Sequence, residues 1–585
     1  MSGSIVRLAV LASVLGLAAC DRPSQAAASS TPFTVPAAWR HPIDAPDVAA
    51  SHGMVVSDAP LASRVGTRIL RAGGSAVDAA VATAFALAVT LPDAGNVGGG
   101  GFAVVLMNGQ PATLDFRETA PAAASRNMFL DEHGALTDRS ISGHLASGVP
   151  GSIAGLWALH QKFGTTPWRE LVEPAIELAE KGFVVDADFS SAIADEAKRL
   201  ARFPASAALF LPGGREPATG STWQNADLAG VLRRIATDGR DGFYTGPTAT
   251  LMVDEMRKGG GIITSADLAG YAPKWRDPVR FTYRTHPIIS MPPPSSGGVT
   301  LAMIAQQLEA YDLAQLGWHS APAIHLQAEA MRRAFAVRND VLGDPDFVTV
   351  DVPRLSSKPF AQELQSSISA GHATPSSQVS GKHGISHDGP HTTHFSVVDA
   401  NGNAVALTTT INSGFGSAVT VTGGGFLLNN EMDDFAAKPG APNQFGLVQG
   451  EANAIAPGKR MLSAMTPTIV LGTDGRAAIV TGASGGPYII TTAWEIVSNI
   501  LDYGMSVAGA MSAPRFHHQH LPDELSLEEA GFDPPVLHAL EQLGHRLTFF
   551  AVPKSGWTVA ATVGRRGSGW HGMADPRLHG EAAGY

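Results

Sequence analysis

Two strand-like stretches, each built around an Asn-Gly pair, constrain the fold most. The stretch "FAVVLMNGQPATLDF" (102–116) contains Asn108-Gly109, and the pattern from Thr393 to Thr410 contains Asn401-Gly402. Asn-Gly between two such runs is the strongest short signal for a β-hairpin. We therefore predict two hairpins, the first of which delivers Arg117 at the end of its second strand. Further strand patterns occur at 424–428, 466–471 and 477–482.

Helical patterns alternate with these strands. Residues 59–72 form a predicted helix that ends at a Gly-Gly pair. Ser75 caps a second helix that runs to about Thr90, with Asp78 as an acidic variant of the capping box. Another helix is predicted near 299–311. Strands with flanking helices indicate a mixed α/β fold, and neither a fixed-period repeat nor a linker between independent domains is visible.

The composition narrows the range of functions. The chain has 585 residues and is 44% hydrophobic, which is ample for a large core. Its formal net charge is -11 without basic runs, which argues against nucleic acid as a partner because phosphate binding needs clustered Lys and Arg. A single cysteine excludes an intrachain disulfide and a zinc site built from cysteines.

The N-terminus has the features of an export signal. Residues 1–20 combine Arg7 with an apolar stretch too short to span a membrane comfortably, and they end in "LAAC", which resembles a bacterial lipobox. Cys20 would then be lipidated and become the mature N-terminus; the alternative is an ordinary signal peptide. Residues 21–35 suit a flexible tether. We predict an exported, periplasmic enzyme anchored at a membrane through Cys20.

A predicted loop meets a predicted strand in "HDGPHTTHFSVVD" (387–399), and the role of Thr392 at this junction has two interpretations. A loop meeting a strand is the simpler interpretation of His391-Thr392. The alternative is that this peptide bond is cut, which would place a hydroxyl nucleophile and a free α-amine of near-neutral pKa on Thr392. The second hairpin lays residues 409–412 alongside Thr392. The sequence leaves open whether Thr410 or Thr409 faces Thr392, because a shift of the strand register by one residue moves each side chain to the other face of the sheet.

Histidine-rich stretches could suggest a metal site. His383, His387, His391 and His394 fall in or beside a loop whose Gly and Pro residues prevent a helix from aligning the rings. The segment 517–520 (HHQH) is interpreted in the same way. We predict no metal and no organic cofactor.

A set of motifs identifies a family. "GSIAG", "DFRETAP", "MPPPSSGG", "TTHFSVVD", "LLNNEMDDFAAKPG", "LSAMTPT", "TGASGGP" and "APRFHHQ" together resemble the γ-glutamyltransferase (glutathione hydrolase) family, from about residue 50 to the C-terminus. The resemblance implies an N-terminal-nucleophile hydrolase with a four-layer αββα sandwich. It also implies a precursor that cuts itself into a large subunit, 36–391, and a small catalytic subunit, 392–585, which pair as a heterodimer.

The resemblance assigns catalytic roles to four residues. Thr392 resembles the family's nucleophile, released by cleavage at His391-Thr392. Thr410 resembles the threonine that hydrogen-bonds the nucleophile. Gly485 and Gly486 resemble the pair that lines the oxyanion hole, a role that suits the backbone N–H groups of a Gly-Gly turn. Without the motifs, Thr410 could be only a strand residue and the two glycines only a turn.

Five further residues resemble those that grip the substrate. Arg117 and Ser463 match the residues that hold the α-carboxylate, for which the fork of Arg is suited. Asn412, Glu431 and Asp434 match the set that receives the α-ammonium. Taken alone, Arg117 could pair with Glu118 or a surface acid, and the two acids could cap a turn. The segment 441–450 resembles the family's lid.

The chain departs from the family's pattern at two positions near this site. Ala464 replaces the second of two adjacent serines, and Pro487 replaces a more polar residue after the glycines. Glu431 stands where many bacterial members carry Gln. These departures affect the choice of substrate rather than the mechanism.

The resemblance implies attack on glutathione or another γ-glutamyl compound, followed by transfer to water, an amino acid or a dipeptide. One alternative is a glutaryl (cephalosporin) acylase of the same fold. Glutaryl groups lack the α-amine, so Asn412, Glu431 and Asp434 favour glutamyl substrates. Another alternative is a non-catalytic lipoprotein that binds peptides.

Overall fold

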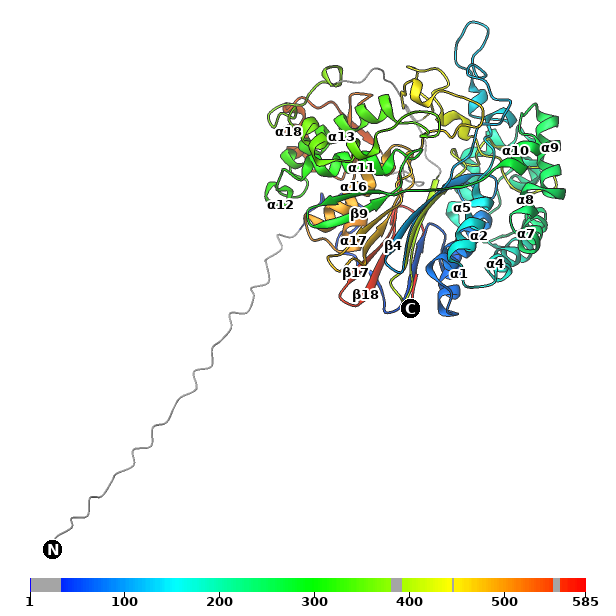
Figure 1. Cartoon of the computed structure of the whole chain (residues 1–585), viewed down its shortest axis with the longest axis horizontal. Helices are drawn as coiled ribbons and strands as arrows, with labels where there is room; N and C mark the ends of the chain where they lie inside the picture. The colour runs from blue at the N-terminus through cyan, green and yellow to red at the C-terminus, as the bar shows by residue number, and fades with distance from the viewer. Residues whose placement is uncertain (2–32, 380–391, 445–446, 551–557) are drawn as a thin grey trace. The chain divides into compact units, whose positions relative to one another are not determined.

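Two seven-stranded sheets lie face to face in the unit formed by residues 35–585 (Figure 1). The structure is a computed structural model, and it describes residues 1, 33–379, 392–444, 447–550 and 558–585. Four predicted residues lie outside the described residues: Cys20, His383, His387 and His391. The predicted lipidation site is therefore not described, and only Thr392 of the predicted cleavage site is.

The first sheet contains both predicted hairpins, and all its neighbouring strands are antiparallel. Its strands, in spatial order, are β19 (Glu581–Gly584), β2 (Met54–Ser57), β10 (Thr392–Val398), β11 (Ala404–Thr410), β3 (Gly100–Met107), β4 (Gln110–Phe116) and β7 (Lys274–Arg276). Asn108 and Gly109 both have positive φ, 52° and 74°, as the tight hairpin turn requires. Chain segments from before and after residue 392 are therefore interleaved within one sheet, since β2 lies between β19 and β10, and β11 pairs with β3.

The second sheet confirms two of the three other predicted strands. In spatial order it contains β1 (Val48–Ala50), β18 (Gly569–Ala574), β17 (Ala561–Arg566), β13 (Ala477–Thr481), β12 (Thr468–Leu471), β9 (His286–Ser290) and β8 (Val279–Tyr283). The predicted strand at 424–428 was wrong, since only an isolated bridge joins Leu427 to Thr420. Gly423 and Gly425 adopt positive φ angles of 72° and 67°, and the turns at these two residues prevent an extended backbone there.

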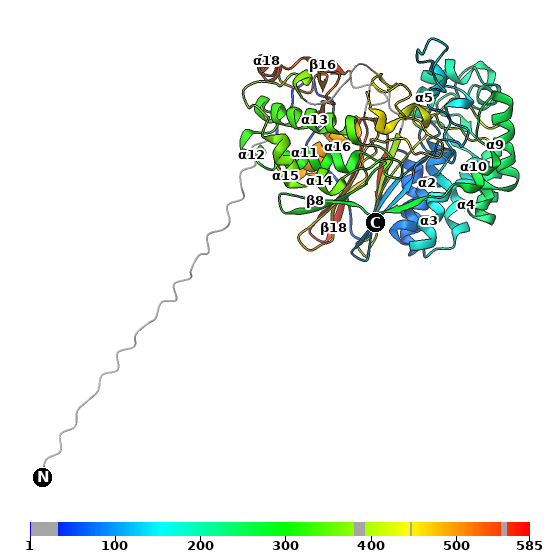
Figure 2. The ribbon, with the colours of Figure 1, turned by 45° about the horizontal axis from the view of Figure 1, so that its top comes forward.

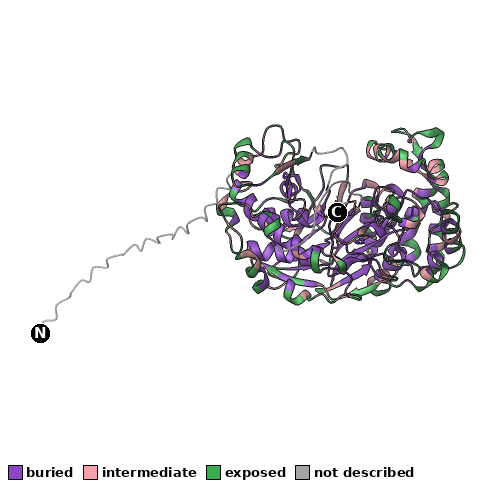
Figure 3. Cartoon of the chain, turned by 90° about the horizontal axis from the view of Figure 1, so that it is seen from above, coloured by how far each residue is buried: buried purple, intermediate pink, exposed green. Residues whose placement is uncertain are grey.

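Three buried clusters separate four layers. Side chains of the first sheet alternate, so that Val55 and Val405 face one group of helices while Val56 and Val104 face the second sheet. The second sheet uses its other face, including Phe281 and Ile479, to pack on another group of helices. Both helical groups flank the sheets in Figures 1 and 2, and Figure 3 shows the buried residues running through all layers. The expected αββα order is confirmed.

Ten helices share the core on the side of the first sheet. They are α1 (Pro60–Arg71), α2 (Ala76–Thr90), α3 (Ser152–Phe163), α4 (Trp168–Lys181), α5 (Ala187–Leu200), α6 (Pro204–Phe210), α7 (Ala226–Asp238), α8 (Asp241–Tyr244), α9 (Gly246–Gly259) and α10 (Ser265–Gly270). The predicted start of α2 is confirmed, because Ser75 and Asp78 form a reciprocal capping box. All fifteen residues of α2 are buried, which explains why small Ala and Val residues fill it.

The remaining helices lie mostly on the other side. They are α11 (Gly297–Leu308), α12 (Leu313–Leu316), α13 (Ala321–Val341), α14 (Val352–Leu355), α15 (Lys358–Gln365), α16 (Tyr488–Leu501), α17 (Val507–Ser512) and α18 (Pro534–Gln542). Two small sheets complete the strands: β5 (Phe183–Val184) with β6 (Thr222–Trp223), and β14 (Phe516–His517), β15 (Leu525–Glu528) and β16 (Leu547–Phe550). None of the helices in the described ranges combines the length and apolar character needed to cross a bilayer.

Candidate active site

Thr392 begins β10 directly opposite Thr410 in β11. This is one of the two registers that the sequence leaves open, and it places both side chains on the same face. The Thr392 hydroxyl donates to Thr410 Oγ1 at 3.1 Å, and the backbone N–H of Asn412 donates to the same oxygen at 2.8 Å. Thr410 is therefore held from both sides, and it fixes the orientation of the Thr392 hydroxyl.

Asn412 lies just beyond β11 in a left-handed conformation, with φ of 77°. Its Nδ2 donates to the carbonyl of Asn430 at 3.0 Å. Asn430 immediately precedes a short 3₁₀ helix, Glu431–Asp434, so this hydrogen bond ties the strand that carries Thr410 to the turn that carries the two predicted acids.

Arg117 follows β4 and reaches the same turn. Its guanidinium pairs with Glu431 at 2.7 Å and with Asp434, and it lies 3.6 Å from Glu118. One turn of 3₁₀ helix places residues i and i+3 on the same side, which explains how both acids meet one cation. Arg117 is only 1% exposed, so its partners are buried groups and not surface acids.

Burial dominates the electrostatics of this cluster. It raises the pKa of Glu118 to about 8 and the pKa of Glu431 well above its usual range, although the nearby Arg117 opposes both shifts. Burial also raises the pKa of Asp434, again against the charge of Arg117. Burial lowers the pKa of Arg117, but the three nearby carboxyl groups outweigh burial and raise it, so Arg117 stays charged. The cluster therefore holds a permanent cation beside acids that do not all ionise at neutral pH.

Ser463 is buried next to Ala464, one of the two departures from the family's pattern. Its Oγ accepts the backbone N–H of Met465 at 3.1 Å, and its carbonyl accepts both the backbone N–H and the hydroxyl of Ser296, at 2.7 and 2.6 Å. Ala464 beside it lines the same cavity as Thr392, so a hydroxyl is missing from the wall itself. The remaining hydroxyl hydrogen of Ser463 is available to an incoming acceptor atom.

Arg338, on α13, is a second buried cation at this wall. Its Nε donates to Ser296 Oγ at 2.9 Å and its Nη1 to Asn339 Oδ1 at 2.9 Å. No carboxylate pairs with it within 4 Å in the described part of the chain, and burial lowers its pKa to about 10. An enclosed cation without a paired anion favours an anionic ligand.

Gly485 and Gly486 lie immediately before α16. Both have positive φ, 123° and 54°, a conformation that favours glycine. Gly486 lines the cavity with Thr392, and the N-terminus of α16 carries a partial positive charge. Pro487 sits at the N-cap with φ of -64°, where its missing N–H costs little, and it lines neither of the two cavities that touch Thr392.

These groups converge on one small cavity of about 30 Å³. Its lining includes Arg117, Arg338, Thr392, Thr410, Asn412, Asp434, Ser463, Ala464 and Gly486, together with Leu447 from the predicted lid. Glu431 and Gly485 stand directly behind it, as the partner of Arg117 and the neighbour of Gly486. The volume is that of about one water molecule, so a glutamyl group fits only after lining residues move.

The described histidines near the site each have partners within the protein. His394 contacts Thr408 at 2.8 Å and Ser396 at 3.2 Å, and burial lowers its pKa to about 3. The side chains of the 517–520 segment contact separate partners: His517 with Thr491, His518 with Asp523 and His520 with the carbonyl of Ser376. Within the described ranges, no three His, Cys, Asp or Glu side chains are grouped to hold a metal ion.

Comparison with known proteins shows the family to which the chain belongs. The family model described as Gamma-glutamyltranspeptidase matches residues 62–585. The chain belongs to the γ-glutamyltranspeptidase family. It is 46% identical over 537 residues to the glutathione hydrolase proenzyme of Escherichia coli (strain K12), and the match covers 91% of each chain.

Solved structures of γ-glutamyltranspeptidase relatives share the fold. The chain is similar to a cephalosporin acylase from Bacillus halodurans, with a TM-score of 0.82, 25% identity and coverage of 94% of this chain and 99% of that one. It is also similar to Helicobacter pylori γ-glutamyltranspeptidase, with a TM-score of 0.56, 43% identity and coverage of 60% and 99%. Because one neighbour is an acylase, the fold alone does not distinguish the two predicted activities, and the residues of the site must.

The structure adds three residues to the predicted site. Glu118 follows Arg117 within the motif "DFRETAP", so its position was a usable signal. Arg338 lies in the last turn of α13, and Asp58 follows β2; only the packing of distant segments brings them to Thr392. No local pattern marks either of them.

Proposed function

We propose that this chain is a self-processing γ-glutamyltransferase and glutathione hydrolase whose nucleophile is Thr392. The observation that carries the proposal is the Thr392–Thr410 hydroxyl pair on the wall of a cavity that also contains Arg117, Asp434 and Ser463. Family membership supports the activity. Cleavage of His391-Thr392 yields a large subunit, 36–391, and a small subunit, 392–585, which stay together because their strands are interleaved in one sheet.

The reaction needs no group beyond those of the chain. The α-amine freed on Thr392 takes the hydroxyl proton while Oγ1 attacks the γ-carbonyl of the donor. The N–H groups at Gly485 and Gly486 stabilise the oxyanion, assisted by the start of α16. The C–N bond of the donor breaks, the leaving amine takes the proton, and a γ-glutamyl ester remains on Thr392. Water, an amino acid or a dipeptide then attacks the ester.

The charges of the cavity favour a glutamyl head group over a glutaryl group. Arg117, Ser463 and Arg338 supply donors for the α-carboxylate, while Asn412, Glu431 and Asp434 supply acceptors for the α-ammonium. Arg117 is paired with Glu431 and Asp434 when no substrate is present. When a zwitterionic head group binds, its carboxylate can pair with Arg117 and its ammonium group with the two acids, so no buried charge is left without a partner. A glutaryl group has a carboxylate that competes for Arg117 but no ammonium group to replace that cation beside the two acids.

Release of nitroaniline from γ-glutamyl and glutaryl anilides tests this choice. We expect faster release from the γ-glutamyl donor and acceleration by glycylglycine, which acts as an acceptor. Preference for the glutaryl anilide would assign the chain to the acylases instead.

Arg338 provides a sharper test of carboxylate recognition. We expect Arg338→Gln to raise the KM for a γ-glutamyl anilide about tenfold or more, because one charged contact to the α-carboxylate is lost. The 4-aminobutyryl anilide lacks that carboxylate, so its KM should stay nearly unchanged. Equal increases for both anilides would show that Arg338 only supports the fold.

The proposed location follows from the N-terminus. A lipid on Cys20 and the 21–35 tether would hold the enzyme at a periplasmic membrane surface. Radioactive palmitate should label the wild-type protein, and this labelling should be lost in Cys20→Ser. A wild-type protein that is unlabelled and recovered in the soluble fraction would contradict the lipid anchor.

A further inference from the structure

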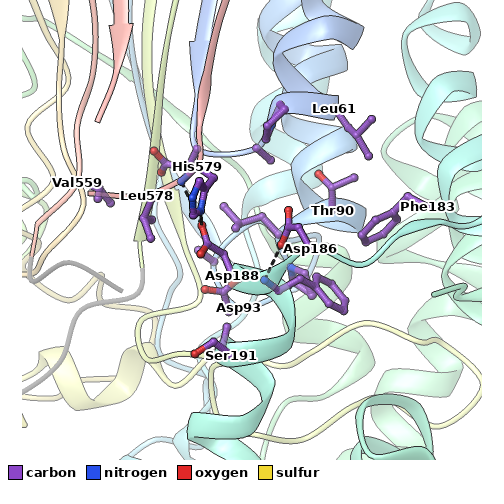
Figure 4. Close-up of a pocket in the computed structure, with 18 of the residues that line it drawn as sticks. Leu61, Thr90, Asp93, Phe183, Asp186, Asp188, Ser191, Val559, Leu578 and His579 are labelled. Carbon is purple, nitrogen blue, oxygen red and sulfur yellow. Dashed lines mark hydrogen bonds and ion pairs between the residues drawn. The ribbon is translucent and has the colours of Figure 1, made fainter. Parts of the chain in front are cut away.

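A second cavity adjoins Thr392 on the side away from Arg117. Its volume is about 550 Å³, far larger than the first. It lies between the end of α2, helix α5 and the segment before β19, as Figure 4 shows for Thr90, Asp186 and Leu578. Thr392 lines both cavities, whereas Arg117 and Ser463 line only the small one. The nucleophile therefore stands between a small compartment for the head group and a larger one.

The large cavity is negatively charged. No Lys or Arg occurs among the described residues that line it, and one histidine, His579, is already paired with Asp188 at 2.7 Å. Asp186 caps α5 by accepting the N–H of Phe189 at 2.8 Å. Five aspartates contribute to its walls: Asp58, Asp93, Asp186, Asp188 and Asp195. Such a concentration of one charge attracts ligands of the opposite charge.

Asp58 gives a second and independent indication of a ligand. This residue is only 7% exposed and lies on the cavity wall. Its Oδ2 accepts the hydroxyl of Thr393, the neighbour of the nucleophile, at 2.8 Å, but its Oδ1 has no hydrogen-bond partner among the residues that the structure describes. Buried carboxylate oxygens are normally paired. The unpaired Oδ1 of Asp58, a residue that contacts Thr393, is a place for an N–H donor from a ligand.

Apolar side chains complete the cavity. Leu61, Phe183 and Phe189 lie on its walls, and Figure 4 shows Leu61 and Phe183 beside the acidic residues. This mixture can cover the methylene groups of a long side chain while its charged end reaches an aspartate.

We infer that this cavity is the leaving-group and acceptor side of the enzyme, and that it selects acceptors with a second cationic group, such as basic amino acids and dipeptides that contain them. The inference rests on the proposed function. The acceptor's neutral amine attacks the γ-glutamyl ester, a C–N bond forms, the C–Oγ1 bond to Thr392 breaks, and the amine proton passes to Oγ1. The aspartates do not change; they hold the acceptor's other cation.

Glycyl-arginine and glycyl-citrulline test the inference, because the two acceptors differ in charge but hardly in shape. We expect the wild-type enzyme to prefer glycyl-arginine in acceptor kcat/KM by about tenfold at low salt, and less at high salt. The double variant Asp188→Asn/Asp195→Asn should lower the ratio about severalfold toward one, because three of the five aspartates remain. Glu196→Gln is the matched control, since Glu196 follows Asp195 on α5 but does not line the cavity; it should keep the preference.

Hydrolysis of a γ-glutamyl anilide without acceptor separates this inference from the proposed function. The wild type and Glu196→Gln should hydrolyse it at similar rates. A wild type that hydrolyses the anilide normally but shows no charge preference among acceptors would overturn the acceptor inference alone, and so would a preference that persists undiminished in the double variant. Absence of hydrolysis by the wild type would overturn both the proposed function and the inference that rests on it.

Discussion

Thr392→Ala is expected to leave the protein as one uncut polypeptide that does not turn over γ-glutamyl donors. The substitution removes the hydroxyl that attacks, both in self-cleavage and in donor turnover, while the paired strands β10 and β11 keep the register. Loss of a covalent nucleophile lowers kcat by about 10⁴-fold or more in hydrolases that act through such a group. Denaturing gels and nitroaniline release measure the two effects on the same sample.

Two further substitutions show whether this loss is specific. Thr392→Ser keeps a hydroxyl and should retain cleavage with reduced turnover. Thr393→Ala removes the adjacent hydroxyl, which faces Asp58 on the other side of the strand, and should still be cut. A cleaved and active Thr392→Ala protein would mean that another residue is the nucleophile.

Arg117→Met is expected to remove donor binding and to destabilise the fold. The substitution leaves Glu118, Glu431 and Asp434 enclosed without their shared cation. Removal of one partner from a buried ion pair costs about 3–5 kcal/mol of unfolding free energy. Arg126→Met is the control, because Arg126 pairs with Glu451 at the exposed surface, where such a pair contributes about 0–1 kcal/mol. Urea unfolding compares the two variants.

A second substitution separates stability from recognition. Glu431→Gln in the Arg117→Met background removes one buried acid, and part of the lost unfolding free energy should return without recovery of turnover. Recovery of turnover together with stability would show that Arg117 is structural and does not bind the donor.

The sequence predicted the elements that local patterns specify. The Asn108-Gly109 hairpin depends on two residues that accept positive φ, and the start of α2 depends on the Ser75–Asp78 capping box. The pairing of Thr392 with Thr410 was left open, because it depends on the geometry of the whole loop. In the structure, Asp399 accepts the backbone N–H groups of Asn401 and Asn403, and this fixes the loop length and the register.

Long-range packing explains what the sequence did not predict. Arg338 reaches the candidate site from α13, and its link to Ser463 passes through Ser296, so three distant segments define one contact. The family resemblance assigns Arg117 and the two acids to opposite ends of a substrate. Their mutual pairing in the absence of substrate follows from burial, which the sequence does not reveal.

Mass spectrometry of the protein quenched in acid during turnover of a γ-glutamyl anilide tests whether Thr392 is the nucleophile freed by cleavage. We expect two chains, the smaller beginning at Thr392 and heavier by one glutamyl group on its N-terminal peptide. Turnover by a single uncut chain, or a glutamyl group attached elsewhere, would contradict it.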